Sequence, residues 1–224
     1  MMKVLLTGGK GMLGRTIRRI LGGRFEIIPT DLPEADITDP GVFSAVLAKH
    51  SPDAVIHCAA MTAVDKCETE RELAYRLNER GSANVATACK AVGCRLLAIS
   101  TDYVFDGTGT EPWQADCTEF APQNVYGESK LAGEKAVRET LESYFIVRTA
   151  WVFGLNGKNF VRTMVNCGLS ATKSGRRRIR PIWHAFWWTW CRPSGSAPIM
   201  RPMKGALSVG RILQPKSSVR PGRT

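Results

Sequence analysis

The sequence predicts an α/β fold, a doubly wound parallel sheet with helices on both faces, over about its first 165 residues. Short continuous apolar runs recur in this part of the chain, which is typical of strands buried on both faces. Amphipathic stretches with helical spacing of apolar residues lie between these runs. A glycine-rich segment follows the first apolar run, at the point where a strand would turn into a helix.

Strands and helices are expected to alternate along the chain. Each strand is assigned to an apolar run, and each helix to a stretch whose apolar residues recur every three or four positions. Gly93 follows the third helical stretch and predicts its end. The expected strands are 3–7, 25–30, 54–58, 95–100 and 144–148, and the expected helices are 14–21, 42–50, 70–92 and 126–141.

Composition excludes several classes of protein. The chain contains no apolar run long enough to span a bilayer and no signal-peptide pattern at its start, so a cytoplasmic location is expected. Its seven cysteines include no C-x-x-C pair. Reduced thiols are therefore expected, with neither a disulfide framework nor a metal site.

The net charge of +11 is unevenly distributed. Residues 1–165 contain all the acidic residues and are nearly neutral, whereas 166–224 contain 12 Lys and Arg and no Asp or Glu. This tail is basic at 173–180, tryptophan-rich at 184–190, and rich in Pro, Gly, Ser and Arg from 193 onward. It shows neither helical nor strand periodicity, and we expect it to be largely irregular. A domain boundary is placed near residue 165.

Gly8, Gly11 and Gly14 form a G-x-x-G-x-x-G motif between the first strand and the first helix. Glycines there allow a tight turn and close approach of a pyrophosphate, which the helix N-terminus also attracts. The motif is weak alone, but in this position it predicts a Rossmann-like dinucleotide site. Asp31 ends the second strand and could either bind the adenosine ribose or cap a turn. A carboxylate there would favour NADH, whereas Arg15, Arg18 and Arg19 could favour NADPH.

Tyr126 and Lys130 form a Tyr-x-x-x-Lys pair on the last helix, where residues four apart share a face. A nearby ammonium would lower the pKa of the Tyr126 phenol and make it a usable general acid. Ser100 and Thr101 follow the fourth strand and could supply a hydroxyl to the substrate carbonyl. The order of these motifs favours a catalytic pair over a surface pair.

The flanking residues resemble the dTDP-4-dehydrorhamnose reductases of the extended short-chain dehydrogenase/reductase family, over about residues 1–165. The resemblance implies a Thr101, Tyr126 and Lys130 catalytic set, in which Tyr126 protonates the C4 oxygen while NADPH, or alternatively NADH, supplies hydride. It also implies a dTDP-sugar substrate contacted by Asp102, Tyr103 and Trp151. The segments that carry it are 55–68 (VIHCAAMTAVDKCE), 100–107 (STDYVFDG), 124–134 (NVYGESKLAGE) and 148–154 (RTAWVFG), with 36–39 (DITD) and 159–161 (NFV). The cofactor contacts so expected are Gly8, Gly11, Met12, Leu13, Gly14, Asp31, Asp36, Ile37, Ala59, Ala60, Thr62, Tyr126 and Lys130.

Five positions near the expected site are given no catalytic, cofactor or sugar-binding role. Met61 stands where the family often has tyrosine, and Val64, Asp65 and Cys67 are expected to shape the pocket floor. For Trp113 a core position is favoured.

The tail departs from the family, which continues with a D-Q-x-G-x-P-T signature. Residues 179–187 can be back-translated so that a shift of one nucleotide reads Ser-Asp-Gln-Tyr-Gly-Met-Pro-Ser. We therefore hypothesise a shift of reading frame near residues 166–178, with a divergent basic extension as the alternative. Resequencing the gene tests this hypothesis.

Four functions were weighed. The first is reduction of the C4 keto group of dTDP-4-dehydro-6-deoxy-L-mannose to dTDP-L-rhamnose. The alternatives are an impaired remnant that binds dinucleotide without turnover, a non-enzymatic regulatory relative, and nucleic-acid binding by the tail. The intact catalytic set disfavours the regulator, and the lack of a predicted fold in the tail disfavours nucleic acid. A homodimer is left open.

Overall fold

The computed structural model describes residues 1–108, 113–114, 116–157 and 159, and the backbone of 206–208. Its sheet is wholly parallel, with strand order β2-β1-β3-β4-β5-β6. The strands are β1 (Lys3–Thr7), β2 (Glu26–Thr30), β3 (Ala54–His57), β4 (Arg95–Thr101), β5 (Tyr144–Thr149) and β6 (Ala206–Ser208). The helices are α1 (Met12–Leu21), α2 (Pro40–His50), α3 (Val64–Thr69), α4 (Arg71–Tyr75), the π-helical η1 (Arg76–Arg80), α5 (Gly81–Val92), the 3₁₀ turn η2 (Asp102–Val104) and α6 (Val125–Thr140). The predicted fold class is confirmed.

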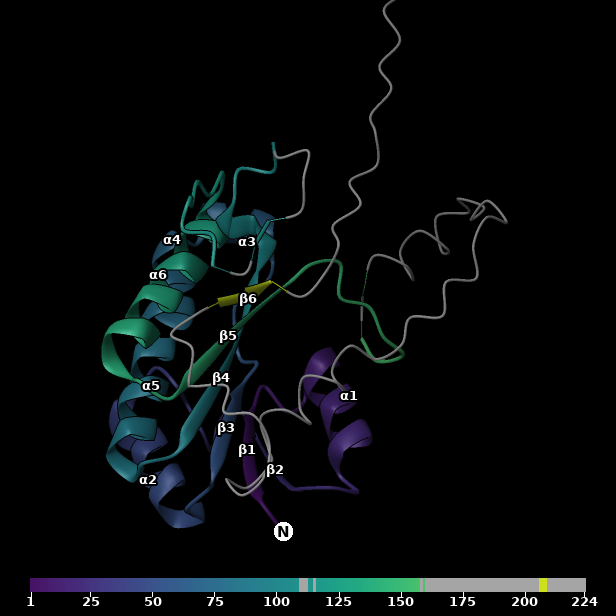
Figure 1. Cartoon of the computed structure of the whole chain (residues 1–224), viewed down its shortest axis with the longest axis vertical. Coiled ribbons are helices and arrows are strands. Elements are labelled where there is room, and N and C mark those ends of the chain that lie inside the picture. Colours follow the sequence, from purple (N-terminus) through teal and green to yellow (C-terminus); the bar gives the residue numbers. More distant parts are fainter. Residues whose placement is uncertain (109–112, 115, 158, 160–205, 209–224) are drawn as a thin grey trace, which may run out of the picture.

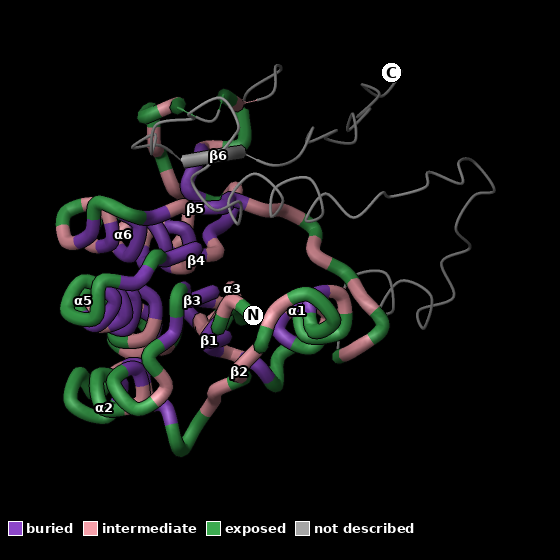
Figure 2. Tube along the Cα trace, turned by 60° about the horizontal axis from the view of Figure 1, so that its bottom comes forward, coloured by how far each residue is buried: buried purple, intermediate pink, exposed green. Residues whose placement is uncertain are grey.

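Helices cover the two faces of the sheet (Figure 1). Helices α2, α5 and α6 pack on one face, where Phe43, Val85 and Val137 meet alternate strand residues such as Leu5 and Leu96. On the other face, α1 contributes Ile17 and Leu21 to a second core with the intervening strand residues. Figure 2 shows the strands buried between these layers. This alternation explains the continuous apolar runs in the sequence.

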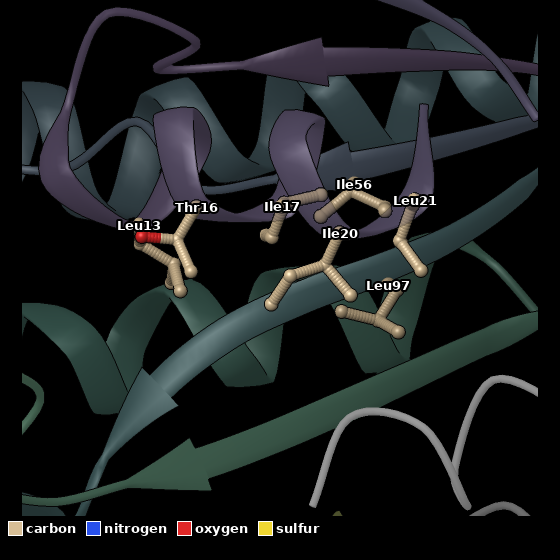
Figure 3. Close-up of a pocket in the computed structure, with 7 residues that line it drawn as sticks. All are labelled: Leu13, Thr16, Ile17, Ile20, Leu21, Ile56 and Leu97. Atoms are coloured by element: carbon tan, nitrogen blue, oxygen red, sulfur yellow. The ribbon is translucent and has the colours of Figure 1, made fainter. Parts of the chain in front are cut away.

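A small void lies under α1, between that helix and strands β3 and β4 (Figure 3). Its volume is about 20 Å³, and its lining is apolar except for Thr16. The Thr16 hydroxyl donates to the Met12 carbonyl. A buried water needs two to four polar partners, so this void is a packing gap and not a ligand site.

The expected helical stretch 70–92 is helical from Arg71 to Val92, but it contains the π-helical turn η1 between α4 and α5. Neither this turn nor the preceding helix α3 was anticipated. An extra residue in a helical turn redirects side chains, and here it turns Asn78 into the interior. The end of α5 at Gly93, which has a φ of +71°, is confirmed.

The tail was expected to be largely irregular, and within it the short strand β6 (Ala206–Ser208), which was not anticipated, pairs with β5. An exposed edge strand offers unpaired N–H and C=O groups to any short segment without proline, which accounts for the pairing. The domain boundary near residue 165 and the rest of 166–224 lie outside the described residues.

Helix α6 passes very close to η1, and Gly133 permits this contact. A Cβ at position 133 would overlap the carbonyl oxygen of Asn78 and come within 3.1 Å of the Ser82 hydroxyl. The contact joins the backbone of α6 to the backbone of η1, and neither can shift easily. An added methyl group would therefore have to push α6 and η1 apart.

We therefore expect Gly133→Ala to lower the free energy of unfolding by about 1–3 kcal/mol, the usual cost of overpacking. The loss would occur although alanine is the better helix former by about 1 kcal/mol. Urea denaturation measures it, with Gly23→Ala as control, because a Cβ at position 23 meets nothing within 4 Å. Equal stabilities of the two variants would contradict the close contact.

Candidate active site

One cleft lies at the carboxyl ends of β1, β3, β4 and β5, where ligands bind in open α/β sheets. Its volume is about 640 Å³, in the range of small-molecule sites. Every residue to which the sequence assigned a catalytic, cofactor or substrate role borders it. These are Gly8, Gly11, Met12, Leu13, Gly14, Asp31, Asp36, Ile37, Ala59, Ala60, Thr62, Thr101, Asp102, Tyr103, Tyr126, Lys130 and Trp151.

The glycine-rich turn is shaped for close contact with a ligand. Gly8 has a φ of +68°, and a Cβ there would lie 2.8 Å from the Ala59 amide nitrogen. A Cβ on Gly14 would overlap the Gly8 carbonyl oxygen. Gly11 caps α1 without a side-chain hydrogen bond, which leaves N–H groups of the first helical turn available to an anion. These features fit the diphosphate of a dinucleotide.

Asp31 caps the turn after β2. Its carboxylate accepts hydrogen bonds from the amides of Lys10 (2.9 Å) and Leu32 (3.2 Å). It also borders the cleft, so binding of a ribose hydroxyl by its remaining lone pairs stays a prediction. Arg15, Arg18 and Arg19 border a separate hollow beside α1 and do not line the cleft.

The catalytic candidates meet where β4 ends. The Thr101 hydroxyl donates to the Asp102 carboxylate and accepts from the Tyr103 amide, both at 3.2 Å. Thr101 also forms a hydrogen bond with Tyr126. The ring of Tyr103 meets that of Tyr126 edge-on, with centroids 5.6 Å apart. The phenol and the threonine hydroxyl are therefore adjacent, as the proposed proton donor and carbonyl partner must be.

The expected lowering of the Tyr126 pKa by Lys130 was wrong. Burial raises the pKa of Tyr126 to about 12, although the hydrogen bond with Thr101 lowers it. The ammonium of Lys130 is buried and donates to the Ile99 carbonyl at 2.8 Å. Burial lowers the pKa of Lys130 to about 8, against the opposing effect of Glu134. Desolvation therefore has the largest effect on the pKa of both groups, and the spacing of two residues along a helix does not reveal how buried they are.

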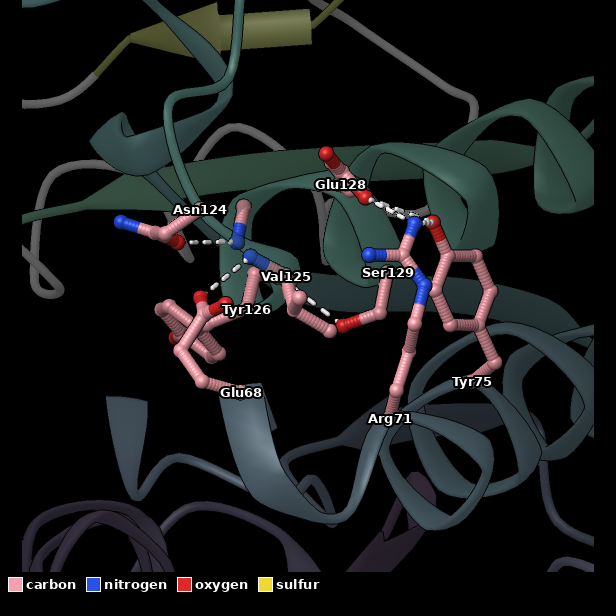
Figure 4. Close-up of polar contacts among 9 residues, drawn as sticks. Glu68, Arg71, Tyr75, Asn124, Val125, Tyr126, Glu128 and Ser129 are labelled. Atoms are coloured by element: carbon pink, nitrogen blue, oxygen red, sulfur yellow. Dashed lines mark hydrogen bonds and ion pairs between the residues drawn. The ribbon is translucent and has the colours of Figure 1, made fainter. Parts of the chain in front are cut away.

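Several contacts hold the N-terminus of α6, and with it Tyr126 (Figure 4). The Asn124 side chain accepts from the Gly127 amide, and Glu68 accepts from the Val125 amide, both at 2.8 Å. Both bonds satisfy N–H groups that have no partner inside the helix. Glu128 accepts from the Arg71 guanidinium at 2.6 Å and from the Tyr75 hydroxyl at 3.0 Å, which joins α4 to α6.

Two of the expected sugar contacts are exposed. Tyr103 is 44% exposed and Trp151 is 64% exposed. Trp113 lies away from the cleft and stacks on Phe105 at 4.5 Å, so its core position is confirmed. Val64 borders the cleft as expected. Asp65 is exposed, and Cys67 packs in a core with Ala74, so neither lines the cleft floor.

Sequence reasoning missed part of the cleft and most of its support. Cys58, Leu77 and Ile99 line the cleft without having been assigned. Ser100, which the sequence offered beside Thr101 as a hydroxyl for the substrate carbonyl, also lines the cleft, and its buried hydroxyl has no hydrogen-bond partner within the described residues. Position at or next to a strand end could have indicated Cys58 and Ile99 but not Leu77. Asn78, in the unforeseen π-helical turn, gave no signal in the sequence.

Across the part of the chain that the structure describes, no three His, Cys, Asp or Glu side chains gather as a metal-binding group. No helix there is long and apolar enough to cross a membrane.

Comparison with known proteins supplies the family. A dTDP-4-dehydrorhamnose reductase of Streptomyces griseus is 45% identical over 163 residues, which cover 72% of this chain and 53% of the relative. The structure of dTDP-4-dehydrorhamnose reductase from Bacillus anthracis in complex with NADP is 44% identical, with a TM-score of 0.72 over 75% of this chain and 59% of that one. The Bordetella bronchiseptica enzyme WbmG in complex with NAD is 26% identical, with a TM-score of 0.64 over 75% of this chain and 60% of that one.

Structural relatives thus bind NADP or NAD. The chain spans a little over half the length of the curated relatives it matches. The model of the RmlD substrate binding domain matches residues 2–174. The chain therefore belongs to the RmlD substrate binding domain family.

Proposed function

We propose that this chain is an NADPH-dependent reductase that converts the C4 keto group of dTDP-4-dehydro-6-deoxy-L-mannose to the alcohol of dTDP-L-rhamnose. The observation that carries the proposal is the meeting of Thr101, Tyr126 and Lys130 with the glycine-rich turn in one cleft. The names of the relatives indicate the substrate class. NADH is the alternative cofactor.

Each residue has a role that its position supports. When bound, NADPH supplies the hydride for the C4 carbon. Gly8, Gly11 and the first turn of α1 would hold its diphosphate. Lys130 would hold the ribose next to the nicotinamide, as the family resemblance implies.

Proton transfer would come from the other side of the cleft. Tyr126 would donate its proton to the C4 oxygen, because a phenol with a pKa near 12 stays protonated at neutral pH. The Thr101 hydroxyl, whose proton points to Asp102 in the structure, would turn that proton to the same oxygen and orient it. Asp102, Tyr103 and Trp151 would contact the sugar.

A second candidate function is dinucleotide binding without turnover. The exposure of Tyr103 and Trp151 favours it, because side chains this exposed would enclose a sugar only in part. The two functions differ in one measurable property, which is oxidation of NADPH in the presence of the keto sugar.

We expect the purified chain to oxidise NADPH when dTDP-4-dehydro-6-deoxy-L-mannose is added, as followed by nicotinamide absorbance. Tyr126→Phe should lower kcat by about 10²–10⁴-fold, the usual contribution of a general acid, without weakening NADPH binding. Tyr144→Phe is the matched control, because Tyr144 begins β5 at the opposite end of the sheet. Undiminished turnover by Tyr126→Phe would refute the mechanism. If the unmodified chain binds NADPH but does not oxidise it, the second candidate function is selected. If it neither binds nor oxidises NADPH, both candidate functions are overturned.

The pH dependence of turnover should be set by Lys130. Its ammonium is charged below a pKa of about 8 and neutral above it, whereas Tyr126 keeps its proton up to about 12. We therefore expect kcat to be constant near neutral pH and to fall as pH rises through about 8. In Lys130→Arg the fall should disappear, because a guanidinium stays charged there. A flat profile for the unmodified chain across that range would contradict the role of the ammonium.

A further inference from the structure

Two of the cysteines lie together where helix α5 ends, away from the cleft. The helix ends in a Schellman turn, in which the Cys94 amide donates to the Cys89 carbonyl at 3.0 Å. The Gly93 amide also donates to the Lys90 carbonyl at 3.3 Å, and Gly93 has the left-handed φ of +71° that this turn needs. The bond from Cys94 therefore joins the backbones of the two cysteines, just before β4 begins at Arg95.

The same turn brings the two side chains into contact. In a Schellman turn, the residues that share the closing bond frequently pack their side chains against each other. Both cysteines are free thiols of one core cluster, and the thiols form a hydrogen bond. Cys89 is fully buried and Cys94 is 4% exposed. A disulfide requires Cβ atoms about 3.5–4.5 Å apart, so two thiols already in contact need little movement to form one.

This contact makes the two thiols unequal. The hydrogen bond from the Cys89 thiol lowers the pKa of Cys94, against the opposing effects of burial and of the Asp53 carboxylate. The same hydrogen bond, together with burial, raises the pKa of Cys89. Cys94 is therefore the thiol that ionises first. Since the thiolate is the form that attacks a disulfide, Cys94 is also the thiol that reacts first.

A reagent can reach Cys94 without unfolding of the core. The last turn of α5, residues 90–93, is exposed, and so is Arg95 on the other side of Cys94. The ends of helices open locally at a much lower free energy than the whole fold. The pair also precedes β4, whereas the cleft lies at the carboxyl end of that strand. The two cysteines are thus separate from the proposed catalytic residues.

We propose that Cys89 and Cys94 are a redox-active thiol pair, which a small disulfide such as oxidised glutathione converts to an intramolecular disulfide across the end of α5. The Cys94 thiolate attacks one sulfur of the oxidant and releases one small thiolate. The Cys89 thiolate then attacks the Cys94 sulfur and releases the second. Each released thiolate takes up the proton that a cysteine has lost. The two cysteines thus lose two electrons and two protons, and the oxidant is reduced to two thiols.

The urea midpoint tests whether the disulfide fits the folded chain. A disulfide that fits stabilises a protein mainly by restricting the unfolded state, whereas one that distorts the native geometry destabilises it. We expect the midpoint of the oxidised full-length chain to be at least that of the reduced chain. In the control C89S/C94S, which lacks both thiols, oxidised glutathione should leave the midpoint unchanged. A lower midpoint of the oxidised chain would overturn the placement of the two thiols, and the same shift in the control would overturn their assignment.

Single substitutions test which thiol attacks. Cys89→Ser keeps the attacking thiol and removes its partner, so we expect one glutathione to stay attached to Cys94. In Cys94→Ser the fully buried Cys89 should take up glutathione at least about 10-fold more slowly. Cys117→Ala is the matched control, because Cys117 packs against a separate core cluster, and it should leave the disulfide unchanged. Equal rates in the two serine variants would overturn the order of attack.

Mass spectrometry identifies the disulfide directly, because trypsin cleaves after Lys90, between the two cysteines. The bond would join peptide 81–90 (GSANVATACK) to peptide 91–95 (AVGCR), each of which contains one cysteine. We expect this joined pair after the folded full-length chain is incubated with oxidised glutathione without urea and its free thiols are blocked, and we expect dithiothreitol to separate it. Absence of the joined pair would overturn the proposal. Its formation only in urea would do the same, because the fold would then not hold the thiols together.

Discussion

The buried ion pair between Glu134 and Arg148 fixes helix α6 to the sheet, and the proposed catalytic residues depend on that helix. Arg148 donates to both carboxylate oxygens of Glu134, at 2.9 and 2.6 Å, and both side chains are almost fully buried. Such a pair gives little net stability relative to apolar residues, but loss of one partner costs about 3–5 kcal/mol. The Arg148 guanidinium also lies over the rings of Phe105 and Phe120, so it holds the segment after η2 as well.

Glu134 also connects this ion pair to the candidate catalytic residue Lys130. It stands one helical turn beyond Lys130 and raises the pKa of that ammonium against the larger effect of burial. At the other end of α6, Asn124 and Glu68 hold the first turn. Between the two ends, Gly133 allows the helix to lie against η1. The helix is thus held along its length, whereas Tyr103 and Trp151, the expected sugar contacts, are exposed.

The sequence alone was sufficient for strands β1 to β5 and for the glycine-rich turn and the Tyr126 and Lys130 pair, because these follow from local rules, whereas most other assigned cleft residues came from the family resemblance. Apolar runs mark buried strands, and the carboxyl ends of parallel strands meet at one edge, so Gly8, Thr101 and Trp151 had to lie together. The π-helical turn at Asn78 could not be predicted in this way. Its cause is tertiary, since the turn serves bonds to Met61 and Ser129 that lie far away in sequence. The prediction of a lowered Tyr126 pKa was wrong for the same reason. The burial that raises this pKa comes from the packed fold and not from the spacing between Tyr126 and Lys130.

Burial also decides which groups at the cleft, and just beneath it at His57, carry a charge. It lowers the pKa of His57 to about 3 and raises those of Cys58 and Tyr126 to about 12, so all three groups are neutral near pH 7. Lys130, with a pKa near 8, keeps its charge under the same conditions. A thiolate or a phenolate in this place would repel the phosphates of the cofactor, and a charged imidazole would further disfavour the ammonium. Desolvation therefore leaves the Lys130 ammonium beside three neutral groups, and the carboxylate of Glu134 is the charged partner that opposes the lowering of its pKa.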